Sequence, residues 1–203
     1  VFFSHQWASF LAPDPGRQQL AAMKASVTAL QQKHARAVEK IYVWVDYFSV
    51  PQVNEASQLQ AISSLPVYVS LLAVFVIVAP DVMHRNTNKA CNLQTYMSRG
   101  WCRAEQLSCK LGNGGAEMYW TAGDNLNTFG EEMHWQYGMV MFDVFNPTSE
   151  FRCCDLHHKC GDDDVLPKLC DKHRLMLPML GLYANVLKSR GEPKFANLLQ
   201  QIE

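Results

Sequence analysis

The sequence predicts an α/β fold with a flavodoxin-like parallel sheet flanked by helices, followed by a helical, Cys-rich C-terminal extension. Two observations lead to this prediction. Short runs of β-favouring apolar residues alternate with longer segments of helical pattern. The runs are almost continuously apolar, which is typical of strands covered on both faces in a parallel sheet. We expect residues 1–150 to form the α/β domain and residues 151–203 to form an extension packed on it.

The first predicted elements are a strand, a helix and a second strand. Residues 1–4 are the end of a buried strand. Residues 17–39 lack Gly and Pro, and this segment has apolar side chains at helical spacing: Leu20, Met23, Val27 and Leu30. Residues 41–45 are all β-favouring, which predicts a strand covered on both faces.

The middle of the chain continues the alternation. A loop at 47–54 precedes Ser57, the expected N-cap of a helix through residue 65. Residues 73–78 then form a buried strand, and residues 81–93 are polar and irregular. One helix is predicted over 96–111, because a Gly-rich turn follows it.

The last predicted elements are less regular. Residues 118–121 and 139–145 are predicted strands, and the stretch between them has no assigned structure. A Cys- and Asp-rich segment follows up to residue 164. A final helix or helix pair is expected over 165–202, interrupted by Pro178.

Composition excludes several classes of protein. The chain has 203 residues, 48% hydrophobic and 18% charged, with a net charge of −1. This balance fits a globular core and argues against nucleic acid or a membrane surface as a partner. The longest apolar run, residues 67–79, is shorter than the roughly 20 residues of a membrane-spanning helix. No signal peptide is visible, and the first residue is not Met, so we expect a piece of a longer, cytoplasmic protein.

Polar side chains follow the first three predicted strands. In parallel sheets, ligands bind beyond the carboxyl ends of the strands, so a site is expected there. The sequence has no phosphate-binding loop, no dinucleotide-binding glycine motif and no nucleophile elbow. The polar residues at the strand ends are His5, Gln6, Trp7, Asp46, Asp81 and His84.

Three motifs resemble the Toll/interleukin-1 receptor (TIR) domain superfamily, over roughly residues 1–145. VFFSHQW (1–7) is similar to the opening TIR strand. VWVD (43–46), with the Gln and Glu residues after it, is similar to the second TIR strand and to the fungal heterokaryon-incompatibility (HET) domain. RGWCRAE (99–105) resembles the TIR stretch in which Trp-Cys precedes a Glu that opens the third helix.

The resemblance implies an NAD⁺ glycohydrolase in immune or cell-death signalling. Such an enzyme cleaves the nicotinamide–ribose bond and leaves ADP-ribose or a cyclic variant. NAD⁺ is then the substrate, and no cofactor is needed. The family also implies self-association through TIR-type surfaces, which completes the site. By the same resemblance, Glu105 is catalytic and the substrate-binding residues are His5, Gln6, Trp7, Asp46 and Trp101.

The chemistry can be stated independently of the resemblance. Nicotinamide is already a cationic leaving group, and the transition state is oxocarbenium-like. One carboxylate beside the ribose can stabilise that charge and orient the sugar hydroxyls. Alternative interpretations are a helix-dipole role for Glu105 in the first turn, a core position for Trp101 and a turn cap for Asp46. A non-enzymatic interaction module is the alternative function.

The sequence also departs from some members of the family. No Arg or Lys follows the serine of the first motif, so Arg99 and Arg103 are the candidates to hold the pyrophosphate. Three of the seven cysteines are scattered along the chain, which fits a reducing compartment. The others cluster and offer a possible structural zinc site, the alternative being a loop with thiols. The weak zinc candidates are Cys153, Cys154, His157 and Cys160.

Overall fold

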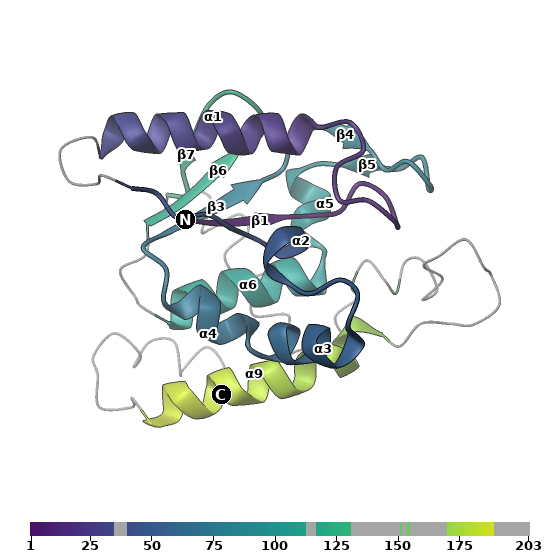
Figure 1. Cartoon of the computed structure of the whole chain (residues 1–203), viewed down its shortest axis with the longest axis vertical. Coiled ribbons are helices and arrows are strands. Elements are labelled where there is room, and N and C mark those ends of the chain that lie inside the picture. Colours follow the sequence, from purple (N-terminus) through teal and green to yellow (C-terminus); the bar gives the residue numbers. More distant parts are fainter. Residues whose placement is uncertain (35–39, 113–116, 131–150, 152–153, 155–169, 189–203) are drawn as a thin grey trace.

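A five-stranded sheet forms the centre of the fold (Figure 1). The computed structural model describes residues 1–34, 40–112, 117–130, 151, 154 and 170–188. Four strands are parallel, and β7 is antiparallel to β6, in the order β2-β1-β3-β6-β7. The parallel strands follow the flavodoxin-like order, so the predicted fold class is confirmed. The strands are β1 (Phe2–His5), β2 (Trp44–Val45), β3 (Val74–Val78), β6 (Glu117–Thr121) and β7 (Asn127–Thr128).

Helices cover both faces of this sheet (Figure 1). Helix α1 (Gln18–Lys33) lies on one face, against the buried side chains of Phe3, Val76, Val78 and Tyr119. The opposite face is covered by α4 (Leu65–Ser70), α5 (Leu93–Met97) and α6 (Gly100–Leu111). The alternation of side chains along β1 therefore sends Phe2 and Ser4 toward α6 and Phe3 and His5 toward α1.

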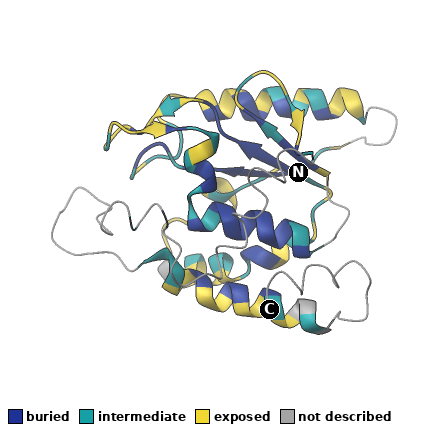
Figure 2. Cartoon of the chain, turned by 180° about the vertical axis from the view of Figure 1, so that it is seen from behind, coloured by how far each residue is buried: buried dark blue, intermediate teal, exposed yellow. Residues whose placement is uncertain are grey.

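The described part of the C-terminal extension packs on the outside of α6 (Figure 1). Helix α9 (Asp171–Lys188) continues through Pro178. The side chains of Phe151 and Leu175 are buried and pack in one cluster with residues of α6. At Gly100 an added Cβ would lie 2.4 Å from the Phe151 ring, so this close approach requires glycine. The sides of α1 and α9 that face away from the rest of the fold are largely exposed (Figure 2).

Several predicted boundaries differ from the structure. Helix α1 buries Met23 and Leu30 of the predicted apolar face and packs Val27 against the same core, but Leu20 is exposed and Gln19 is buried instead. The predicted strand at 41–45 shrinks to β2, which is an edge strand, and Tyr42 is 78% exposed. An edge strand has a neighbour on one side only, so its flanking residues are not covered as those of a central strand are.

The helices on the second face also differ from the prediction. Helix α3 (Glu55–Ser63) is capped by Asn54, whose side chain accepts a hydrogen bond from the Ser57 N–H, so Ser57 is not the N-cap. The single helix expected over 96–111 is two helices, since α5 ends at Met97 and α6 begins at Gly100. A capping box of Asn92 and Thr95 starts α5 earlier than expected. The polar stretch 81–93 holds the two-stranded hairpin β4 (Val82–Met83) and β5 (Ala90–Cys91).

Two parts of the prediction have no structural test. The strand expected at 139–145 lies outside the described residues, as do both ends of the helix expected over 165–202.

In the part of the chain that the structure describes, no helix is both long enough and apolar enough to cross a membrane.

Candidate functional site

A pocket of about 200 Å³ lies beside the residues that follow β1 and β2. Four residues predicted from the sequence line it: Trp7, Asp46, Trp101 and Glu105. Larger hollows of about 720 and 550 Å³ elsewhere on the described surface contain none of the predicted site residues. The pocket is completed by Trp44, Val50, Gln52, Gln58, Ile62 and Leu65.

Glu105 lies in the second turn of α6 and reaches the pocket from the face of the sheet that α6 covers. The helix begins at Gly100 and has no acidic residue in its first turn. Glu105 therefore does not open the helix, and the interpretation that it offsets the helix dipole from the first turn is wrong. Trp101 lines the pocket and also packs against both neighbouring core clusters, so its core interpretation is confirmed and its contact with a substrate stays a prediction.

The carboxyl group of Glu105 is buried, with 8% of the residue exposed. Its Oε2 accepts a hydrogen bond from the hydroxyl of Ser4, and that hydroxyl lies 2.5 Å from the Tyr96 hydroxyl. Burial raises the pKa of Glu105 to about 8, and the charge of Asp46 adds to this effect, against the opposing effects of Ser4 and His5. The side chain is therefore mostly a neutral acid at pH 7.

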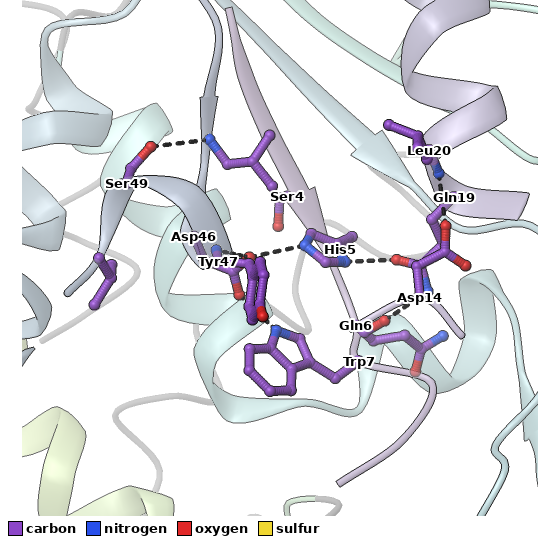
Figure 3. A network of polar contacts seen from close by, with 12 residues as sticks. Ser4, His5, Gln6, Trp7, Asp14, Gln19, Leu20, Asp46, Tyr47 and Ser49 are labelled. Atoms are coloured by element: carbon purple, nitrogen blue, oxygen red, sulfur yellow. Dashed lines mark hydrogen bonds and ion pairs between the residues drawn. The ribbon is translucent and has the colours of Figure 1, made fainter. Parts of the chain in front are cut away.

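Asp46 is held as a carboxylate by hydrogen-bond donors (Figure 3). Its Oδ1 accepts from His5 Nε2 at 2.8 Å and from the Tyr47 backbone N–H at 2.6 Å. Its Oδ2 accepts from Trp7 Nε1 at 2.7 Å. Burial opposes ionisation, but the bond and charge of His5 outweigh it and keep the pKa of Asp46 below its usual value. One carboxylate therefore fixes the indole of Trp7 at the pocket wall.

The hydrogen bonds around His5 define its protonation state (Figure 3). The amide nitrogen of Gln19 donates to the Gln6 carbonyl at 2.8 Å, so the amide oxygen faces His5 Nδ1 at 2.5 Å. His5 Nδ1 must then donate, while Nε2 donates to Asp46. Burial lowers the pKa of His5, but the hydrogen bond and charge of Asp46 raise it by more, so the net shift is upward. His5 is therefore an imidazolium paired with Asp46.

The structure places His5 and Gln6 outside the wall of this pocket. His5 lies behind Asp46. The amide nitrogen of Gln6 donates to the Asn92 carbonyl at 2.8 Å and to Thr95 Oγ1 at 3.0 Å, so Gln6 holds the start of α5. His84, another predicted strand-end residue, accepts from backbone N–H groups in its own turn and does not line the pocket.

Arg103 is not available for a pyrophosphate group. It is buried, its Nε donates to the Met97 carbonyl at 2.8 Å, and its guanidinium carbon lies 5.2 Å from the centre of the Phe151 ring. It therefore serves the packing of the extension, contrary to the expectation from sequence. Arg99 immediately precedes α6 and does not line the pocket either.

Sequence reasoning missed Ser4, Tyr96 and Trp44 as site residues. Ser4 was recoverable from strand alternation, because the position two residues after Phe2 faces the same helices. Trp44 belongs to β2, and it borders the pocket because β2 is an edge strand. No signal in the sequence places Tyr96 beside Ser4, since the two residues are 92 positions apart.

The zinc candidates are tested only in part. Cys154 lies 3.8 Å from Cys170, measured between the sulfur atoms. Cys153, His157 and Cys160 lie outside the described residues. Within the described ranges, no group of three or more His, Cys, Asp or Glu side chains is arranged to hold a metal ion.

Comparison of the chain with known protein families, with curated proteins and with solved structures finds no match.

Proposed function

We propose that the protein is an NAD⁺ glycohydrolase and that Glu105 is its catalytic residue. The observation that carries the proposal is the composition of one pocket, which combines two carboxyl groups with three indoles: Glu105, Asp46, Trp7, Trp44 and Trp101. The described residues that line it include no Lys or Arg. Aromatic faces and carboxylates attract a flat cation such as a pyridinium ring, so this lining suits the nicotinamide end of NAD⁺.

The pocket is too small for the whole NAD⁺ molecule, so part of the substrate would lie outside it. Sites for drug-sized ligands are roughly 300–1,000 Å³, whereas this pocket has about 200 Å³. We infer that nicotinamide and its ribose occupy the pocket and that the pyrophosphate and adenosine lie beyond its mouth. A cationic ring in the pocket also favours the ionised form of Glu105, because opposite charges lower the pKa of a carboxyl group.

Glu105 acts on the developing charge of the sugar. As the C1′–N bond breaks, its electron pair neutralises the nicotinamide ring and the ribose becomes oxocarbenium-like. The Glu105 carboxylate stabilises that charge, while Ser4 and Tyr96 orient the carboxylate from behind. Water then attacks C1′, loses a proton to solvent, and ADP-ribose is released.

The test is incubation of concentrated protein with NAD⁺ and detection of nicotinamide by chromatography. We expect turnover in the wild type and its loss in Glu105→Gln and Glu105→Ala. Glu117→Gln is the matched control, because Glu117 is an exposed carboxylate on β6. Turnover that survives in both Glu105 variants removes this residue from the mechanism.

An interaction module is the second candidate function, and one observation favours it. The segment from α2 (Asp46–Ser49) to α4 exposes apolar side chains; Phe48, for example, is 81% exposed. Such a group of side chains is typical of a protein-binding surface. The other exposed members are Tyr47, Val53, Leu59, Val67 and Tyr68, with Leu71 directly after α4. Self-association without turnover of NAD⁺, measured by sedimentation and by the nicotinamide assay on clustered protein, would support this alternative.

A further inference from the structure

Two half-buried cysteines of the C-terminal extension lie in contact. Cys154 Sγ is 3.8 Å from Cys170 Sγ, and no disulfide joins them. The backbone N–H of Cys154 donates to the Phe151 carbonyl at 2.8 Å, so Cys154 sits one turn after that ring. Cys170 immediately precedes α9. The sulfur contact therefore connects the Phe151 segment with the start of α9.

The remaining described cysteines have a different environment. Cys91, Cys102 and Cys109 are buried. Burial raises the pKa of Cys102 well above its usual value and that of Cys109 to about 12. Thiol–disulfide exchange needs both a thiolate and access to the reagent. Those buried thiols are protected, and among the described cysteines Cys154 and Cys170 are the two that are partly exposed to a reagent.

We propose that Cys154 and Cys170 are a modification site that forms a reversible disulfide by exchange with a small-molecule disulfide such as oxidised glutathione. One cysteine thiolate attacks the glutathione disulfide, and a glutathione thiolate leaves. The second cysteine thiolate attacks the mixed disulfide and displaces the other glutathione. The two cysteines lose two electrons and two protons in total, and two reduced glutathione molecules gain them. Since a disulfide is about 2.05 Å long, the sulfur atoms must move about 1.8 Å closer.

The bond would fasten two segments of the extension to each other beside α6. The Phe151 ring fills the space beside Gly100 at the start of α6 and packs with Leu175 of α9. The charged ends of Arg103 and Lys172 lie 5.2 and 5.5 Å from the centre of this ring. Cys154 and Cys170 lie on the two segments that hold the ring in place. Oxidation therefore joins these segments covalently, next to the helix that carries the pocket residues.

The first experiment maps the bond in the wild-type protein. Reduced native protein is treated with oxidised glutathione, blocked by alkylation, digested and analysed by mass spectrometry. Before alkylation we expect an intact mass lower by two hydrogen atoms, and after digestion a cross-linked Cys154–Cys170 peptide that a reducing agent separates. Pairing of either residue with Cys153 or Cys160, a stable glutathione adduct, or no loss of thiols would overturn the proposal.

The second experiment measures the effect of the disulfide on thermal stability, as a change in Tm. Cys154 and Cys170 are 16 positions apart, and closing a loop of this length is expected to raise the Tm by roughly 6–12 °C. Cys154→Ser and Cys170→Ser should show no rise with oxidised glutathione, whereas Cys91→Ala should keep it. A cross-linked wild type with an unchanged or lower Tm would refute the fastening. Neither experiment uses NAD⁺, so the result is independent of the proposed activity.

Discussion

Replacing Glu105 with glutamine is expected to stabilise the fold at neutral and alkaline pH, although it should abolish the proposed activity. The wild-type side chain is buried and is held by the Ser4 hydroxyl. Glutamine has the same shape and still offers an oxygen to Ser4. It cannot ionise, so the variant never has to place a negative charge in this desolvated position.

The size of the effect follows from the pKa of Glu105, which burial raises from 4.5 to about 8. Between these values the folded protein holds a proton that the unfolded chain has lost, so the free energy of unfolding falls as the pH rises. At about 1.4 kcal/mol per pH unit, the free energy of unfolding of the wild type falls, relative to its value below pH 4.5, by about 3 kcal/mol at pH 7 and by about 5 kcal/mol above pH 8. Glu105→Gln escapes this loss.

Urea unfolding at several pH values measures the difference directly. The stability advantage of Glu105→Gln should be below about 1 kcal/mol at pH 5 and should grow to about 5 kcal/mol at pH 8.5. Glu117→Gln is the control, because Glu117 is exposed and its hydrogen bond from Tyr119 lowers its pKa, so no such growth is expected. An advantage that does not change with pH, or a variant less stable than the wild type at pH 8.5, would refute the reasoning.

Three further predictions concern activity and packing. If the ionised form of Glu105 is the active one, kcat/KM should rise with pH through about 8, and an inflection near 4.5 would contradict the burial argument. His5→Gln should lower the free energy of unfolding by about 2 kcal/mol and raise the pKa of Asp46, measurable by carboxyl NMR titration; the stability gap should shrink as the pH rises through the raised pKa of His5. Gly100→Ala should lower the free energy of unfolding by about 1–3 kcal/mol, because its Cβ meets the Phe151 ring at 2.4 Å. Gly181→Ala on α9 is the control: its Cβ meets no atom within 4 Å, so it should raise the free energy of unfolding by up to about 1 kcal/mol. Equal effects of the two substitutions in thermal unfolding would contradict this packing.

The sequence predicted those features that depend on local composition. The run that forms β3 is apolar without interruption, and the strand is paired on both sides and covered on both faces. The sequence did not predict which strand lies at the edge, because strand order depends on distant pairings. Residues 41–45 have the composition of a central strand, yet β2 pairs with β1 alone.

The site was predictable to the same extent. Trp7, Asp46, Trp101 and Glu105 meet in one pocket because they follow strand ends or lie on α6, as the motif order indicated. The pairing of these side chains was not predictable, since the bonds of Ser4 to Glu105 and of His5 and Trp7 to Asp46 join segments far apart in the sequence. Gln19 is not among the residues of the predicted apolar face, and it is buried because it binds both the ring of His5 and a backbone carbonyl.

Strand β1 connects the pocket to both helical layers through two adjacent residues. Ser4 reaches Glu105 on one face of the sheet, and His5 reaches Gln19 of α1 on the other while it grips Asp46. A shift of α1 that displaces the Gln19 amide would thus be transmitted through a single imidazole ring to an acidic side chain on the pocket wall. Helix α1 therefore has an indirect connection to the pocket wall through Gln19, His5 and Asp46, although it contributes no atom to the lining.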